Sequence, residues 1–258
     1  MKSLVLHDVI KAFGGVVAVS KVTMEVDEKS IHGLIGPNGA GKTTLFNLIT
    51  GVLIPNSGLI HFKGKDMAGL KPHERTGLGI CRTYQNIKLF KSASVIDNVT
   101  VAMPYRIRAG LKQLMIKVPF RQTMEEKELR KRSEEILRFV GLYEKRDHIS
   151  SALPFGEQRR LEIARALATN PTLLLLDEPC AGMNQAEKAP MIDLIRKIRE
   201  RQITVIVIEH DITMIAEICD TVTVLNFGVV IAQDSPESIQ KNPLVIEAYL
   251  GREELAYG

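Results

Sequence analysis

The stretch from Gly36 to Thr44 carries the clearest chemical signal in the sequence. It reads GPNGAGKTT and fits the phosphate-binding pattern G-x-x-x-x-G-K-[ST]. The glycines let the backbone wrap closely around phosphates, and the following helix N-terminus adds a favourable dipole. We expect Lys42 to reach the β- and γ-phosphates and the Thr43 hydroxyl to bind Mg²⁺. The predicted phosphate-binding residues are Gly36, Pro37, Asn38, Gly39, Ala40, Gly41, Lys42, Thr43 and Thr44.

Two carboxylates, Asp177 and Glu178, end the apolar run in LLLLDEP. A carboxylate at the end of a buried parallel strand lies beside the P-loop, at the carboxyl edge of the sheet. We expect Asp177 to hold Mg²⁺ through a water molecule. Glu178 is then placed to polarise the attacking water as a general base. Because Asp-Glu-Pro is also favourable turn chemistry, a solvent-facing strand end is the alternative interpretation.

His210 and Gln85 each follow another predicted strand, in IVIEHD and CRTYQNIKLF. An isolated histidine there is more often structural, but beside the other strand ends it is placed to sense a γ-phosphate. The Gln85 amide can reach Mg²⁺ or the attacking water, and the alternative is an ordinary surface glutamine. The predicted catalytic residues are Glu178, His210, Gln85 and Lys42, and the predicted metal-binding residues are Thr43, Gln85 and Asp177.

The elements around these residues predict an α/β fold with a mainly parallel sheet. Short apolar strands are expected at residues 31–36, 172–177 and 204–209. Between the last two, MIDLIRKIRE (191–200) has its apolar residues at helical spacing. Strand–helix–strand order implies parallel strands with right-handed crossovers.

Other segments indicate antiparallel and helical parts. The alternation of Val22, Met24 and Val26 is typical of a half-buried strand, and residues 58–67 and 222–232 favour hairpins. A pattern typical of helices begins near Ser92. We therefore expect an ATP-binding core with an antiparallel β subdomain, an inserted helical subdomain and a C-terminal helical tail. Their predicted ranges are 1–90 with 166–235, 91–165 and 236–258.

The amino-acid composition excludes few classes of protein. The 258 residues are 45% hydrophobic and 25% charged, which is typical of a soluble globular protein. No stretch approaches the ~20 apolar residues that span a bilayer, and the N-terminus lacks the apolar core of a signal peptide. A net charge of +4 does not argue for nucleic acid, and the three cysteines are expected to be reduced thiols.

Taken together and in this order, these motifs resemble the nucleotide-binding subunits of ABC transporters over nearly the whole chain. The resemblance implies a P-loop NTPase (RecA-like) core that binds ATP and Mg²⁺. It implies that Phe13 stacks on adenine, for which simple core packing is the alternative. It also implies a signature stretch that completes the ATP site of a partner subunit, formed by Leu153, Pro154, Phe155, Gly156 and Glu157.

A finer resemblance is to the larger ATPase of branched-chain amino acid importers, carried by RTYQNIKLF, LPFGEQRRLEIARAL, DEPCAGMN and IEHDITMI. ATPases of lipopolysaccharide export and urea import are similar alternatives. The resemblance implies a head-to-tail dimer with a homologous but distinct ATPase chain. It implies integral membrane permease subunits, an indirectly coupled substrate-binding protein, no nucleic acid, and a peripheral location on the cytoplasmic face of the inner membrane.

The sequence also departs from the family pattern. Pro154 replaces the serine of the family's LSGGQ signature and so lacks both its hydroxyl and its N–H. Asn184 stands where the family has aspartate. Segment 104–125 is basic and apolar, and it either meets membrane subunits or anionic headgroups or forms a solvated basic face.

Two other functional classes remain as alternatives, a soluble ABC ATPase of DNA repair or translation and a catalytically silent ATP switch. The single cassette argues against the first, and Glu178 and His210 argue against the second.

Overall fold

The computed structural model describes residues 1–103 and 124–250, and it divides into two compact units. One unit combines residues 1–86 with the chain from Pro171 onward, and the other comprises Ile87–Asn170. The helical range expected from the sequence, 91–165, falls inside the second unit. Residues 104–123, which make up nearly all of the basic and apolar segment 104–125, lie outside the described residues.

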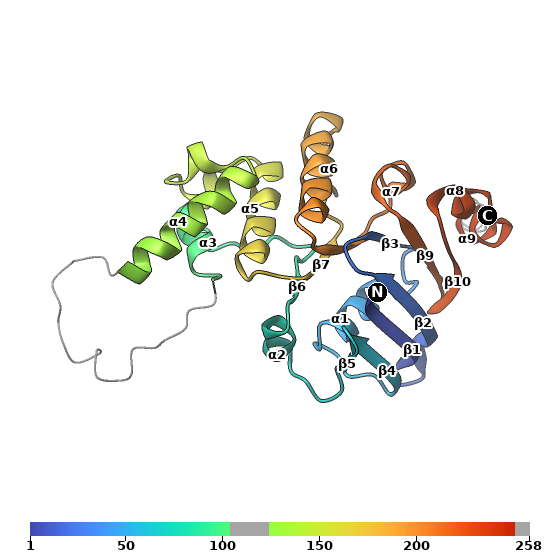
Figure 1. Cartoon of the computed structure of the whole chain (residues 1–258). Coiled ribbons are helices and arrows are strands. Elements are labelled where there is room, and N and C mark those ends of the chain that lie inside the picture. Colours follow the sequence, from blue (N-terminus) through green and yellow to red (C-terminus); the bar gives the residue numbers. More distant parts are fainter. Residues whose placement is uncertain (104–123, 251–258) are drawn as a thin grey trace. The chain divides into compact units, whose positions relative to one another are not determined.

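A six-stranded sheet forms the centre of the first unit, in the order β10-β9-β3-β8-β7-β6 (Figure 1). Five of these strands are parallel, and β10 pairs antiparallel with β9. This confirms the predicted mainly parallel sheet. The strands are β3 (Ile31–Ile35), β6 (Ile80–Arg82), β7 (Leu173–Asp177), β8 (Thr204–Ile208), β9 (Thr221–Asn226) and β10 (Val229–Asp234).

The central strands are apolar because both of their faces are covered. Every residue of β3, β7 and β8 is buried, as expected for parallel strands between helices. Helix α6 (Gln185–Glu200) connects β7 to β8 and buries Met191, Leu194, Ile195 and Ile198, which confirms the predicted helical face. Asn184 begins this helix as its N-cap in a capping box with Glu187. Helices α1 (Lys42–Ile49) and α7 (Ile212–Ile218) follow β3 and β8.

A second, antiparallel sheet has the order β2-β1-β4-β5. Its strands are β1 (Lys2–Phe13), β2 (Val16–Asp27), β4 (Ser57–Phe62) and β5 (Lys65–Asp66). Val22, Met24 and Val26 all face inward, and the predicted hairpin turns at Lys63 and Gly64. Residues of β1, β2 and β4 share one apolar core with α1, β7 and β8. The short helix α2 (Pro72–Gly77) then leads into β6.

The last strands form the hairpin expected at residues 222–232. Phe227 and Gly228, both with positive φ, make its turn. The Gly228 N–H donates to the Ala40 carbonyl at 2.9 Å, and the Ser20 N–H donates to the Gly228 carbonyl at 2.8 Å. The hairpin is therefore fixed against the loop that precedes α1. Helices α8 (Pro236–Lys241), capped by Ser235, and α9 (Pro243–Leu250) follow it.

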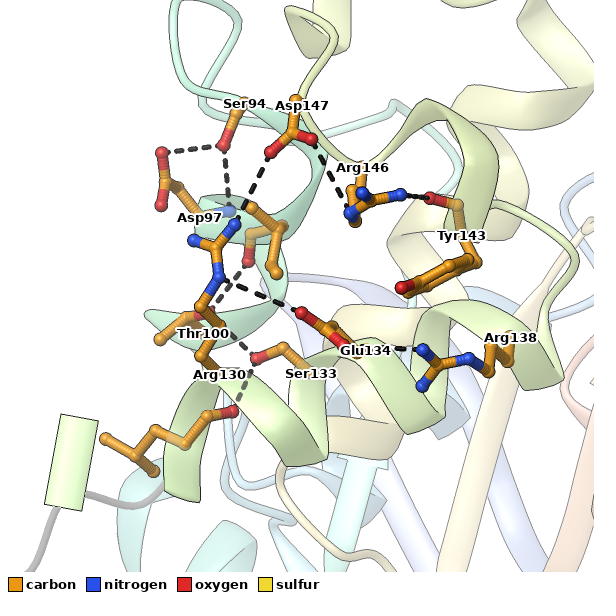
Figure 2. Close-up of polar contacts among 12 residues, drawn as sticks. Ser94, Asp97, Thr100, Arg130, Ser133, Glu134, Arg138, Tyr143, Arg146 and Asp147 are labelled. Carbon is orange, nitrogen blue, oxygen red and sulfur yellow. Dashed lines mark hydrogen bonds and ion pairs between the residues drawn. The ribbon is translucent and has the colours of Figure 1, made fainter. Parts of the chain in front are cut away.

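The second unit contains α3 (Val95–Thr100), α4 (Met124–Phe139) and α5 (Phe155–Ala168), with short 3-10 turns at Tyr143–Lys145 and Ser150–Ala152. Figure 2 shows that polar contacts join its parts. Thr100 and Ser133 hydroxyls lie 2.8 Å apart between α3 and α4, and Arg130 pairs with Asp147 at 3.5 Å. On α4, Leu137 is buried and Ile136 is half-buried, and Val140, directly after the helix, is buried.

Within the described residues, no helix combines the length and apolarity that a membrane span requires.

Leu6 and Leu59 offer a matched test of this core. They lie on the neighbouring strands β1 and β4, but Leu6 is fully buried and Leu59 is 50% exposed. We expect Leu6→Ala to lower the free energy of unfolding by about 2–5 kcal/mol through lost burial and a residual cavity. Leu59→Ala should change it by about 0.5 kcal/mol or less. Urea unfolding of both variants checks this, and equal effects would contradict the assignment of the core.

His32 makes the fold sensitive to acid. It lies on β3 with Nε2 2.8 Å from the Thr223 hydroxyl, and burial lowers its pKa to about 4. Because the unfolded chain binds this proton at the ordinary pKa of ~6.5, stability falls as pH drops from that value toward 4. Between pH 7.5 and 5.0 we expect His32 to account for a loss of about 2 kcal/mol.

Denaturant titrations of wild type and His32→Gln at both pH values measure this contribution as a difference. The variant should lose less stability than wild type by about that 2 kcal/mol. An identical loss in both proteins would show that protonation of His32 does not contribute to the pH dependence of the free energy of unfolding.

Candidate functional site

The loop from Gly36 to Thr44 joins β3 to α1. Its backbone packs so closely against neighbouring strands that a side chain would not fit at two of its glycines. Gly36 has φ +148°, and a Cβ added there would lie 2.0 Å from the Leu225 carbonyl oxygen. Gly41 has φ +104°, and its Cβ would lie 2.4 Å from the Ala18 carbonyl oxygen. Two neighbouring strands therefore press against the loop, and only glycine fits at these positions.

Lys42 lies across this loop. Its Nζ donates to the carbonyls of Gly36 at 2.6 Å and Pro37 at 3.1 Å, and the residue is 7% exposed. Thr43 is exposed and Thr44 is half-buried in the first turn of α1. The Lys42 ammonium, the N-terminus of α1 and two threonine hydroxyls thus lie at one loop. Groups of these kinds bind phosphate.

Asp177 ends β7 and forms a buried ion pair with Arg82. Arg82 Nη2 lies 2.6 Å from Asp177 Oδ2, and both side chains are 5% exposed. The same guanidinium donates to Asn47 of α1 at 2.6 Å and lies 5.2 Å from the ring centroids of Phe46 and Tyr84. Arg82 therefore connects the strand end to the helix that begins at the P-loop. Arg82 was not predicted as a site residue, although it ends β6 three residues before Gln85.

Glu178 brings together two of the residues predicted from the sequence. Gln85 Nε2 donates to Glu178 Oε2 at 2.8 Å, and His210 Nε2 lies 3.0 Å from Glu178 Oε1. Because a carboxylate only accepts, the natural assignment places a proton on His210 Nε2. The contact follows from strand order, since β8, β7 and β6 are parallel neighbours and end at the same edge of the sheet.

The backbone at Glu178 is in the left-handed region, with φ +49°. This conformation is uncommon for a residue with a side chain and costs about 1–2 kcal/mol. Its N–H donates to the Ile208 carbonyl of β8 at 3.0 Å, so the sheet continues across the turn. The Glu178 side chain is 16% exposed. An acceptor of this kind, held by two donors and reachable from solvent, can take a proton from water.

Glu209 is a buried carboxylate immediately before His210 that the sequence analysis did not single out. It is 4% exposed and accepts hydrogen bonds from the backbone N–H groups of Cys180 at 2.7 Å and His210 at 3.3 Å. Burial raises the pKa of this carboxyl, and the two backbone donors partly oppose that rise. Its position could have indicated a role, because Glu209 is an acidic residue at the end of the apolar run TVIVIE (204–209).

Phe13 ends β1 and is 48% exposed. Val16, its partner in register on β2, is 69% exposed, and Val17 is 50% exposed. Lys11 Nζ lies 5.2 Å from the Phe13 ring centroid. Two residues along β2 from Val16, Ala18 touches Gly41 of the P-loop. The exposed ring contradicts the alternative of simple core packing and leaves an aromatic face available for stacking.

The predicted signature stretch lies in the second unit, where α5 begins. Pro154 is the N-cap residue, and it has no side-chain capping bond. Glu157 accepts from Lys145 Nζ at 2.7 Å in the first turn, and Phe155 is 44% exposed. Leu153 is buried. The stretch is therefore a helix start with an exposed aromatic, and its acidic residue suits the N-terminal dipole.

The residues expected to hold Mg²⁺ suit that ion in type. Thr43, Gln85 and Asp177 supply hydroxyl, amide and carboxylate oxygens, and Mg²⁺ is commonly held by one or two protein oxygens together with phosphate and water. In the described part of the chain, no group of three or more His, Cys, Asp or Glu residues is arranged to hold a metal ion.

Comparisons with known proteins agree with this geometry. A family model described as ABC transporter matches residues 19–181, and one described as branched-chain amino acid ATP-binding cassette transporter matches residues 229–254. The high-affinity branched-chain amino acid transport ATP-binding protein BraF of Pseudomonas aeruginosa is 42% identical over 93% of this chain and 94% of its own length.

Two solved structures extend the comparison. An ATP-binding cassette of an ABC transporter in its ADP conformation has a TM-score of 0.84 at 30% identity, over 97% of this chain and 99% of that one. A dimeric cassette in a post-hydrolysis state, bound to ADP and Pi, has a TM-score of 0.73 at 26% identity, over 90% and 98%. This chain belongs to the ATP-binding proteins of ABC transporters, in the family of the branched-chain amino acid transport ATPases.

Proposed function

We propose that this chain powers the import of branched-chain amino acids by hydrolysing ATP on the cytoplasmic face of the membrane that holds its permease. The observation that carries the catalytic part is the convergence of Gln85 and His210 on Glu178, at the sheet edge that also bears the P-loop. The similarity to BraF, a branched-chain amino acid transport ATP-binding protein, and the match at residues 229–254 support the choice of substrate.

The P-loop residues supply binding and charge stabilisation. Backbone N–H groups between Gly36 and Thr44 and the ammonium of Lys42 hold the phosphates, and the exposed Phe13 ring stacks on the adenine. Mg²⁺, when bound, neutralises the phosphate oxygens. Thr43, Gln85 and Asp177 are the residues that would hold it, and Arg82 fixes the Asp177 carboxylate by its 2.6 Å ion pair.

Glu178 acts as the general base. Its carboxylate accepts a proton from the attacking water, while His210 and Gln85 fix its two oxygens by donating to them. His210 also lies at the strand end from which a γ-phosphate can be contacted. Because these three side chains come from adjacent strands, their mutual geometry is set by the sheet.

The signature stretch, Leu153–Glu157, serves the ATP bound by a partner subunit. The dimeric cassette among the structural relatives supports this arrangement. We propose that the partner is a homologous but distinct ATPase, and that the pair drives permease subunits which receive amino acid from a binding protein. Binding of ATP drives closure only in so far as the closed dimer binds it more tightly. Urea and lipopolysaccharide transport are the alternative systems.

The general-base assignment has a direct test. We expect Glu178→Gln to lower the kcat of ATP hydrolysis by about 10²-fold or more, because the amide cannot accept the proton. The Kd for ATP should stay within about twofold, since the P-loop makes the binding contacts. Steady-state phosphate release and nucleotide titration measure the two quantities. Glu135→Gln, on the exposed face of α4, is the matched control, and wild-type turnover in Glu178→Gln would refute the assignment.

The transport assignment requires the assembled system. We expect the tagged chain to co-purify from membranes with permease subunits and a second ATPase chain. In proteoliposomes, this complex and its binding protein should take up leucine in an ATP-dependent way. Uptake of urea instead of leucine, or co-purification with lipopolysaccharide-export components, would overturn the assigned substrate.

A further inference from the structure

Two backbone hydrogen bonds close the turn after Glu178, from the Ala181 N–H to the Glu178 carbonyl at 3.2 Å and from the Met183 N–H to the Cys180 carbonyl at 3.1 Å. Residue 179 is a proline and has no N–H, so the first backbone N–H after Glu178 belongs to Cys180. That amide donates to Glu209 Oε1 at 2.7 Å, which is the shorter of the two bonds that the Glu209 carboxylate accepts. The Glu209 side chain, directly after β8, thus ties this turn to the neighbouring strand end.

The other oxygen of the same carboxylate faces the backbone that directly follows Glu209, at the end of β8. The His210 N–H donates to Glu209 Oε2 at 3.3 Å. One buried side chain therefore contacts the backbone two residues after Glu178 and the backbone of His210, on opposite sides of the Glu178–His210 contact. Because Glu209 is only 4% exposed, water cannot readily replace either bond.

We infer that Glu209 is a positioning residue for ATP hydrolysis, which sets the distance between the Glu178 carboxylate and His210 by holding both backbones. The inference rests on the roles proposed for Glu178 and His210. Glu209 contacts only backbone amides in these interactions, so it acts through the other two residues. Misplacing a reacting group by about 1 Å can lower a rate by ~10²-fold, so loss of this carboxylate should act on kcat.

A second contact between the same two segments provides a control. Lys188 of α6 pairs with Asp211, the N-cap of α7, at 2.7 Å. This pair is partly exposed, with side-chain exposures of 25% and 33%, and it lies beyond the turn. Its loss should leave the Glu178 turn in place. Asp211 itself is retained in the control because its carboxylate also caps α7 through the amides of Thr213 and Met214.

The experiment compares Glu209→Ala, Glu209→Gln and Lys188→Gln in the full chain. In Glu209→Ala we expect kcat to fall about 10- to 100-fold with the Kd for ATP within about twofold. Glu209→Gln keeps one acceptor oxygen at the same position and should recover at least half of the lost activity on a logarithmic scale. Lys188→Gln should remain within about twofold of wild type.

Hydrogen exchange provides a readout that does not depend on catalysis. The peptide containing the Cys180 amide should exchange at least tenfold faster in Glu209→Ala than in wild type or Lys188→Gln. Unchanged exchange, unchanged kcat, or equal losses of kcat and ATP affinity in both Glu209 variants would overturn the inference. If Glu178→Gln keeps wild-type turnover, the proposed catalytic roles fail, while the exchange result still decides whether Glu209 holds the turn.

Discussion

The carboxylate of Glu178 joins three adjacent strand ends, and the geometry of the site depends on it. Gln85 and His210 donate to its two oxygens at 2.8 and 3.0 Å, and its backbone is held in the left-handed region by the neighbouring strand. Parallel strands present their carboxyl ends at one edge, so β6, β7 and β8 can contribute side chains to a single point. The P-loop follows β3, the next strand in this order.

Buried charge in this unit is placed where fixed donors compensate for it. Asp177 is matched by Arg82, which is also bonded to Asn47 and flanked by two aromatic rings. Glu209 accepts from two backbone amides, those of Cys180 and His210. Breaking a buried ion pair such as Arg82–Asp177 commonly costs about 3–5 kcal/mol, because the remaining charge is left without compensation. These residues therefore fix the site more firmly than surface ion pairs could.

The P-loop and the signature stretch are helix starts of different construction. Before α1, glycines with positive φ pack against neighbouring carbonyls and enclose Lys42. Before α5, a proline sets the chain direction and an exposed phenylalanine follows, with Glu157 held by Lys145. The first arrangement surrounds the Lys42 ammonium with loop carbonyls. The second leaves the Phe155 side chain exposed at the start of the helix.

The sequence by itself determined the parallel sheet, the hairpins and the residues at the strand ends. Those features follow from local patterns, such as the apolar run before Asp177 and the helical spacing of Met191, Leu194 and Ile195. The sequence also placed Glu178, His210 and Gln85 at strand ends, but it could not determine their contacts. Only the tertiary structure decided that Gln85 meets Glu178, that Arg82 pairs with Asp177, and that Glu209 reaches the Cys180 amide. These contacts join residues 29 to 95 positions apart, and strand order and side-chain rotamers, which no local pattern encodes, bring them together.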